Sequence, residues 1–152
     1  MTQRLLVVQH TPSPAMQDML EAVLRGAHHP ELTDVSVEVK AALSAGPADV
    51  LEADALVLGT PANIGYMSGA LKHFLDQVYY PCLQVTERKP YGVYVHGNDD
   101  TAGALRAIHK IAGGMSWKQA APDVSVTGPP AREDLSACEE LGALLGFAAE
   151  GS

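Results

Sequence analysis

The stretch of residues 55–83 constrains the fold of this chain more than any other. It opens with a charge-free apolar run at residues 55–58, which is typical of a strand buried on both faces of a parallel sheet. Gly59 and Thr60 end that strand, and a loop containing Pro and Gly follows at residues 61–66. Apolar side chains then recur at helical spacing, at Leu71, Phe74, Leu75 and Val78. A strand, a loop at its carboxyl end and a helix form the unit that lines ligand sites in open α/β sheets.

Strands and helices alternate along the rest of the chain. Apolar runs and alternating patterns predict further strands at residues 4–9, 35–39, 91–95 and 124–126. Apolar residues at helical spacing, together with a short alanine-rich segment, predict helices at residues 16–24, 47–52, 105–112 and 135–145. This alternation predicts a parallel sheet whose strands are joined by right-handed crossovers.

The segment of residues 54–77 resembles the flavodoxin superfamily, and within it the NAD(P)H-dependent FMN reductases and the flavodoxin-like NAD(P)H:quinone oxidoreductases. Gly-Thr-Pro at residues 59–61 and Gly-Tyr-Met-Ser-Gly at residues 65–69 match, in place and order, two motifs that run along the flavin ring in those proteins. The resemblance implies an α/β, flavodoxin-like three-layer sandwich, with a five-stranded parallel sheet in the order 2-1-3-4-5 and helices on both faces. It also implies FMN as the cofactor.

The length and composition set further bounds. A chain of 152 residues, 47% of them hydrophobic, suits a single flavodoxin-like domain over residues 1–152. No apolar run is long enough to cross a membrane, and the first residues carry no signal-peptide pattern. Two cysteines make neither a disulfide framework nor a metal motif, so we expect a cytoplasmic protein. The net charge of −8 argues against nucleic-acid binding.

Three loops follow the first, third and fourth predicted parallel strands, at residues 10–16, 60–67 and 96–101. The carboxyl ends of parallel strands share one edge of the sheet, so these loops are expected to form one site. The predicted cofactor-binding residues are His10, Thr11, Ser13, Pro14, Ala15, Met16, Thr60, Pro61, Ala62, Asn63, Ile64, Gly65, Tyr66, His96, Gly97, Asn98 and Asp99. No catalytic side chain and no metal ligand is predicted.

The first loop ends at a helix N-terminus, which offers free amides and a positive dipole end to a phosphate. Thr11 and Ser13 add hydroxyl groups, although for Ser13 taken alone a role as helix cap is favoured. Compared with the family's Ser/Thr-x-Ser/Thr-Gly-Asn-Thr phosphate loop, Pro14 stands at the usual Gly and Met16 at a usual hydroxyl. His10 is either one more donor or a packed histidine at the strand end.

The other two loops would surround the ring system. Asn63 and backbone groups suit the polar edge of an isoalloxazine, and Tyr66 could stack on its face. The loop from His96 to Thr101 resembles the family's polar loop over the pyrimidine edge. For Asp100, however, a role as helix cap in an Asx turn is favoured.

Two functions of different class are consistent with these residues. The first is an FMN-dependent oxidoreductase that takes electrons from NAD(P)H and passes them to a quinone, free flavin or a small electrophile. The alternative is a non-enzymatic electron carrier of the flavodoxin type, which would dock a redox protein partner; a family member that has lost its flavin is a third alternative. Apolar residues at 79–83, expected close to the site, predict self-association into a homo-oligomer.

Overall fold

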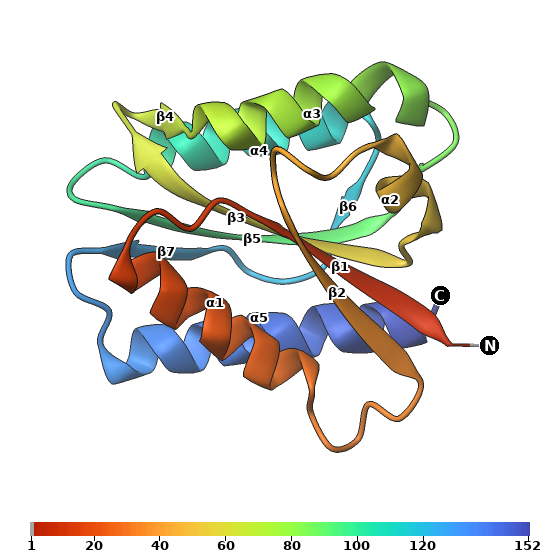
Figure 1. Cartoon of the computed structure of the whole chain (residues 1–152), viewed down its shortest axis with the longest axis horizontal. Coiled ribbons are helices and arrows are strands. Elements are labelled where there is room, and N and C mark those ends of the chain that lie inside the picture. Colours follow the sequence, from red (N-terminus) through yellow and green to blue (C-terminus); the bar gives the residue numbers. More distant parts are fainter. Residues whose placement is uncertain (1) are drawn as a thin grey trace.

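The computed structural model describes residues 2–152 as alternating strands and helices (Figure 1). The strands are β1 (Gln3–Gln9), β2 (Val35–Ala41), β3 (Ala55–Asn63), β4 (Tyr66–Met67), β5 (Pro90–Gly97), β6 (Lys118–Gln119) and β7 (Val124–Thr127). The helices are α1 (Pro14–Ala27), α2 (Pro47–Glu52), α3 (Gly69–Cys82), α4 (Ala102–Gly114) and α5 (Arg132–Glu150). None of the helices in this part of the chain is long and apolar enough to cross a bilayer.

The parallel strands run in the order β2-β1-β3-β5-β6, and β7 also pairs with β5. This is the flavodoxin-like α/β arrangement expected, but residues 2–152 form seven strands, so the prediction of five strands in the order 2-1-3-4-5 was wrong. One extra strand is β4, which turns back and pairs antiparallel with β3. The other arises because the last strand is split: β6 pairs with the start of β5 and β7 with its end. Pro122 lies between the two pieces and has no amide proton for a sheet hydrogen bond.

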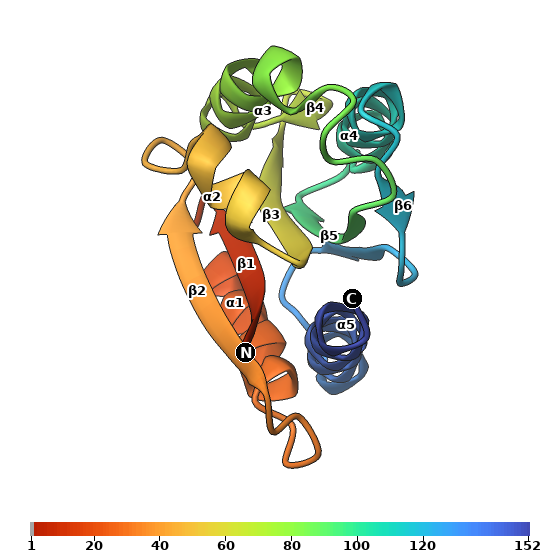
Figure 2. The ribbon, with the colours of Figure 1, turned by 90° about the vertical axis from the view of Figure 1, so that its right-hand side faces the viewer.

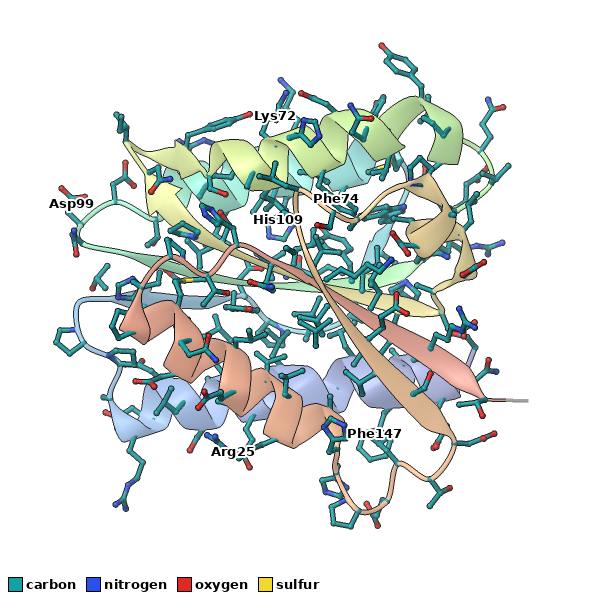
Figure 3. The ribbon with its side chains drawn as sticks, viewed as in Figure 1. Arg25, Lys72, Phe74, Asp99, His109 and Phe147 are labelled. Atoms are coloured by element: carbon teal, nitrogen blue, oxygen red, sulfur yellow. The ribbon has the colours of Figure 1, made fainter. Side chains whose placement is uncertain are left out.

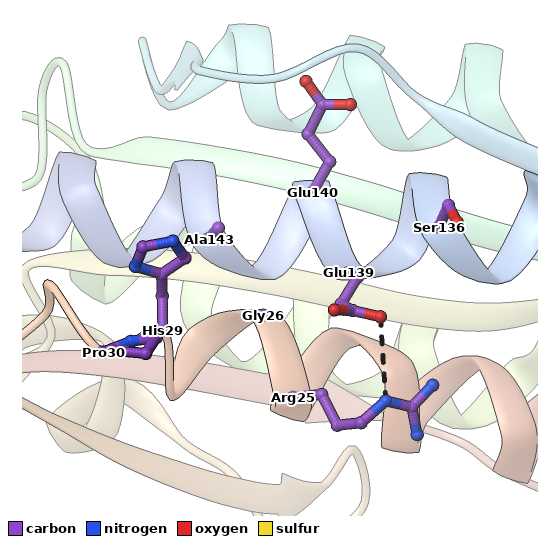
Figure 4. Close-up of a pocket in the computed structure, with 8 residues that line it drawn as sticks. All are labelled: Arg25, Gly26, His29, Pro30, Ser136, Glu139, Glu140 and Ala143. Atoms are coloured by element: carbon purple, nitrogen blue, oxygen red, sulfur yellow. Dashed lines mark ion pairs between the residues drawn. The ribbon is translucent and has the colours of Figure 1, made fainter.

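Helices cover both faces of the sheet, so the three layers expected from the sequence are present (Figure 2). Helices α1 and α5 cover one face, and α2, α3 and α4 cover the other. Strand β3 has helices on both sides, and its residues 55–61 are all buried, which explains why the sequence places no charge there. Arg25 of α1 and Glu139 of α5 form an ion pair of 3.7 Å across a groove of about 300 Å³ at the carboxyl-terminal half of α1 (Figure 4).

Two tyrosines of β5 are buried, one with a hydrogen-bonded hydroxyl and one without. The hydroxyl of Tyr91 makes a 2.6 Å hydrogen bond with Nδ1 of His109, whose Nε2 lies 2.8 Å from Oδ2 of Asp123. Burial, with a smaller contribution from Asp123, raises the pKa of Tyr91 to about 12, so its hydroxyl stays protonated as the network requires. Tyr94 is fully buried over Gly59, and within residues 2–152 its hydroxyl has no hydrogen-bond partner.

These two hydroxyl groups predict opposite effects of the same substitution. Tyr94→Phe removes a buried polar group that no partner satisfies, so it should raise the free energy of unfolding by about 1 kcal/mol. Tyr91→Phe breaks a satisfied network and should lower it by about 1 kcal/mol. Urea denaturation at neutral pH measures both values. If Tyr94→Phe were as damaging as Tyr91→Phe, the Tyr94 hydroxyl would have a partner, such as a bound water.

Candidate functional site

The three predicted loops meet at the carboxyl ends of β1, β3 and β5, at the left of Figure 1. The amide of His10 donates to the Gly59 carbonyl oxygen at 3.0 Å, and Pro61 is in register with His96. The first loop is therefore tied to the second, and the second lies beside the third.

A fourth segment, after β7, belongs to the same edge of the sheet and was not predicted. Nε2 of His96 lies 2.7 Å from the Gly128 carbonyl oxygen, and the hydroxyl groups of Thr101 and Ser125 are 2.6 Å apart. The sequence held one signal for it: the turn residues Gly128 and Pro129 follow a parallel strand, as the other three loops do. The loop after β5 is thus supported from the neighbouring strand.

The first loop presents free donors in front of α1. The Oγ of Ser13 accepts a hydrogen bond from the Met16 amide at 3.2 Å, so Ser13 caps the helix and its own O–H remains available. The hydroxyl of Thr11 instead donates to the side chain of Gln9. The backbone amides of Thr11, Ser13 and Ala15 donate to no acceptor within residues 2–152. Pro12 and Pro14 have no amide proton, and the first turn of α1 carries no acidic side chain.

His10 adds an unsatisfied atom to this loop. Its Nδ1 is buried and has no hydrogen-bond partner among the described residues. Buried side-chain nitrogens without a partner are uncommon in folded proteins, so this one calls for a polar partner that the described residues do not supply. A cavity of about 320 Å³ adjoins His10 and Thr11 and reaches Leu43 and Ala70.

The second loop is a hairpin rather than the irregular loop predicted for residues 61–66. Strand β3 continues to Asn63, which pairs with Tyr66 of β4. The two turn residues, Ile64 and Gly65, have φ angles of 53° and 71°, and a type I′ turn requires two such positive angles. A β-branched residue is unusual in this conformation, which is why no hairpin signal is visible in the sequence. The Ile64 side chain is fully exposed and Tyr66 is 40% exposed.

The hairpin is fixed at its base and along one side. The buried Thr60 hydroxyl donates to the Pro61 carbonyl oxygen at 2.8 Å and accepts from the Ser68 amide at 3.0 Å, so it holds the base of the hairpin from within the fold. The turn rests directly on α4: a Cβ added at Gly103 would lie 1.9 Å from the Gly65 carbonyl oxygen. Figure 2 shows β4 between α3 and α4.

The third loop carries two exposed carboxylates. Asp99 lies at its tip and points away from the sheet (Figure 3). Oδ1 of Asp100 accepts from the Ala102 amide at 3.1 Å, so Asp100 caps α4 as the favoured alternative had it. On the α3 side of the hairpin, Lys72 is committed to Asp76 at 2.6 Å, and this hydrogen bond raises the pKa of the lysine. Within residues 2–152 no group of His, Cys, Asp and Glu could hold a metal ion.

Comparison with known proteins assigns the chain to a family. Residues 24–126 match the sequence model of the family described as NADPH-dependent FMN reductase. The chain belongs to this family. The resemblance seen in residues 54–77 is therefore confirmed, and the flavin that the family description names is the one expected.

Individual relatives agree with this assignment. A protein named flavodoxin from Aquifex aeolicus (strain VF5) is 37% identical over 75 residues, which are 49% of this chain and 40% of that protein. The match thus spans less than half the length of this curated relative. Among solved structures, a WrbA-like flavodoxin from Agrobacterium tumefaciens has a TM-score of 0.77 at 20% identity, and the match covers 99% of both chains. A flavodoxin from the domain Archaea has a TM-score of 0.82 at 19% identity, and the match covers 97% of this chain and 99% of that one. These likenesses show the flavodoxin-like fold.

The conformation of Ile64 leads to a stability prediction. A left-handed backbone costs a residue other than glycine about 1–2 kcal/mol, so Ile64→Gly should raise the free energy of unfolding by about 1 kcal/mol. Leu43→Gly is the matched control, because Leu43 is also exposed but has no positive φ, and there glycine should leave stability unchanged or lower it. Urea denaturation compares the two. A loss of stability in Ile64→Gly would show that the turn is not strained.

Proposed function

We propose that this protein is an FMN-dependent oxidoreductase that takes electrons from NAD(P)H, with FMN at the junction of the loops after β1, β3 and β5. The observation that carries the proposal is the hairpin turn. In a member of the NADPH-dependent FMN reductase family, an exposed apolar residue is held in an unfavourable conformation at this junction. Such strain gathers at functional sites, and a bound ring would cover the apolar surface.

The first loop fits the phosphate of FMN. Three free amides, of Thr11, Ser13 and Ala15, and the O–H of Ser13 lie at the positive end of α1. Nδ1 of His10 is a fifth group that needs a polar partner. These groups compensate for the two prolines, and they would hold the phosphate without any Lys or Arg in the loop.

The hairpin and the loop after β5 fit the ring. Asn63 and Asn98 present amide side chains, and Ile64 and Tyr66 present apolar surface. When bound, FMN supplies the two-electron redox chemistry, and the residues of this chain hold it and orient its substrates. Trp117 does not cover this surface, since it is buried and donates from Nε1 to Thr86 at 2.9 Å. An open surface suits an enzyme in which nicotinamide and a small acceptor, such as a quinone, free flavin or an electrophile, bind in turn.

Flavin titration and reduction by nucleotide test the function directly. FMN should bind saturably and more tightly than FAD, as followed by flavin fluorescence. In the absence of oxygen, NADPH or NADH should then bleach the visible absorbance of the FMN-loaded protein within seconds. No saturable binding below millimolar FMN, or no bleaching by either nucleotide, would refute the proposal.

An electron carrier is the second candidate function. The relative from Aquifex aeolicus is named a flavodoxin, and the net charge of −8 would steer the protein toward basic partners. A carrier would be reduced by a redox protein but not directly by a nicotinamide nucleotide. FMN binding combined with bleaching by a reductase protein alone would therefore favour the carrier.

We also propose that the protein self-associates, although residues 79–83 lie elsewhere than the sequence predicted. The apolar residues at 79–83 end α3, about 20 Å along the helix from its start at the hairpin, so they do not lie close to the site. Tyr80 is 79% exposed and Val85 64% exposed, whereas Cys82 is buried. Light scattering at tens of micromolar protein should give the mass of an oligomer, and a monomeric mass would count against self-association.

Phosphate binding by Ser13 leads to a further prediction. Ser13→Ala removes one hydrogen bond to a charged acceptor, so FMN affinity should fall several-fold while riboflavin, which has no phosphate, binds nearly as before. Ser68→Ala is the matched control, because Ser68 caps α3 through the Leu71 amide at the same distance of 3.2 Å. It should lose comparable stability without changing the ratio of FMN to riboflavin affinity. Equal weakening of both ligands in Ser13→Ala would show that Ser13 acts only as a cap.

A further inference from the structure

One basic residue beside the hairpin has no hydrogen-bond or ion-pair partner among residues 2–152. Arg106, on the second turn of α4, is exposed and makes neither an ion pair nor a side-chain hydrogen bond within residues 2–152. Several other basic residues are neutralised by carboxylates: Arg4 by Glu52, Arg25 by Glu139, Lys40 by Asp49 and Lys72 by Asp76. The five N–H donors of the Arg106 guanidinium are therefore free to bind an anion.

The guanidinium lies close to the hairpin turn. Its Nη2 lies 3.8 Å from the position of a Cβ added at Gly103, and the Gly65 carbonyl oxygen lies 1.9 Å from that same position. The Arg106 guanidinium and the hairpin turn thus both lie close to Gly103 on the surface of α4. The exposed side chain of Ile64 adjoins Gly65 in the turn, so a charged group and an apolar group belong to the same small region.

The charged groups near the hairpin do not pair with Arg106, so it is available to bind an anionic ligand. The carboxylate of Asp100 lies near the turn, with Oδ2 at 3.5 Å from a Cβ added at Gly65, but it forms no ion pair with Arg106 and caps α4. Lys72, on the α3 side of the hairpin, is held by Asp76. The chain as a whole carries a net charge of −8, which repels a polyanionic nucleotide. Such a ligand therefore needs a local cation at the site, and Arg106 is placed to supply it.

We propose that Arg106 binds a phosphate group of the nicotinamide dinucleotide when the nicotinamide lies at the hairpin. This rests on the proposed function, and it adds a residue that recognises the substrate. A guanidinium forms paired hydrogen bonds with phosphate oxygens, which neither a lysine nor a glutamine can reproduce. The phosphate is either the pyrophosphate that NADH and NADPH share or the 2′-phosphate that only NADPH has. Arg106 is thus a binding residue and takes no part in the electron transfer.

Steady-state kinetics of the FMN-loaded protein test the proposal. Arg106→Gln should raise KM for the nucleotide roughly ten-fold, with kcat and FMN affinity unchanged, and Arg106→Lys should recover only part of the loss. Lys110→Gln is the matched control, because Lys110 is also exposed and its loss removes one positive charge one turn further along α4. A rise in KM for both nucleotides identifies the pyrophosphate, and a rise for NADPH alone identifies the 2′-phosphate. An Arg106→Gln variant that behaves like Lys110→Gln with both nucleotides would overturn the proposal.

Calorimetry without turnover separates this inference from the proposed function. ADP and 2′,5′-ADP carry the two kinds of phosphate but cannot transfer electrons. At least one of them should bind the wild-type protein several-fold more tightly than Arg106→Gln. Equal binding to the two proteins, in a protein whose FMN is bleached by NADPH, overturns the role of Arg106 and leaves the function standing. Loss of nucleotide binding in Arg106→Gln, in a protein that NADPH does not bleach, supports the role of Arg106 and refutes the reductase function.

Discussion

The geometry of the candidate site depends on the two hydrogen bonds of the buried Thr60 hydroxyl. This hydroxyl donates to the Pro61 carbonyl oxygen and accepts from the Ser68 amide, so one side chain joins the end of the buried strand to the start of α3. Residues 62–67, which form the hairpin, lie between these two points. A threonine can do this because its hydroxyl is both donor and acceptor and its branched Cβ fits a strand. Valine would fill the same space but would leave the Ser68 amide unsatisfied.

Much of the fold follows from the sequence because burial on both faces of a sheet forbids charges. Residues 55–58 could be placed as a central strand for this reason, and the helical periodicity of α1 and α3 followed from the single face that each buries. The family motifs in residues 59–69 supplied the position of the candidate site. Local sequence patterns were enough to predict an element wherever the same face or faces of that element are buried along its whole length.

The parts that sequence reasoning missed depend on single residues or on distant contacts. The turn at Ile64 lacks the Asn-Gly pattern that marks such hairpins, because tertiary packing holds an unfavourable residue there. The last strand is split around Pro122 into β6 and β7. The sequence predicted only β7, because β6 has just two residues and shows no strand pattern of its own. The contact between His96 and Gly128 joins residues 32 positions apart, and no local pattern predicts it. Likewise, the sequence could not decide whether Ser13 caps the helix or binds phosphate. The structure shows that the two roles are compatible, because Ser13 caps α1 and still has a free O–H.

The contact between Gly103 and the Gly65 carbonyl oxygen has a consequence for how the site moves. No side chain separates the turn from α4 at this point, so the turn has no soft layer against which to shift. Helix α4 is in turn bound to the sheet and to the segment before β7 through His109. A flat ligand arriving at this edge would meet a surface whose conformational entropy was already lost when the chain folded. Recognition at this edge would then be closer to lock-and-key than to induced fit, and the backbone would keep the same shape with and without its ligand.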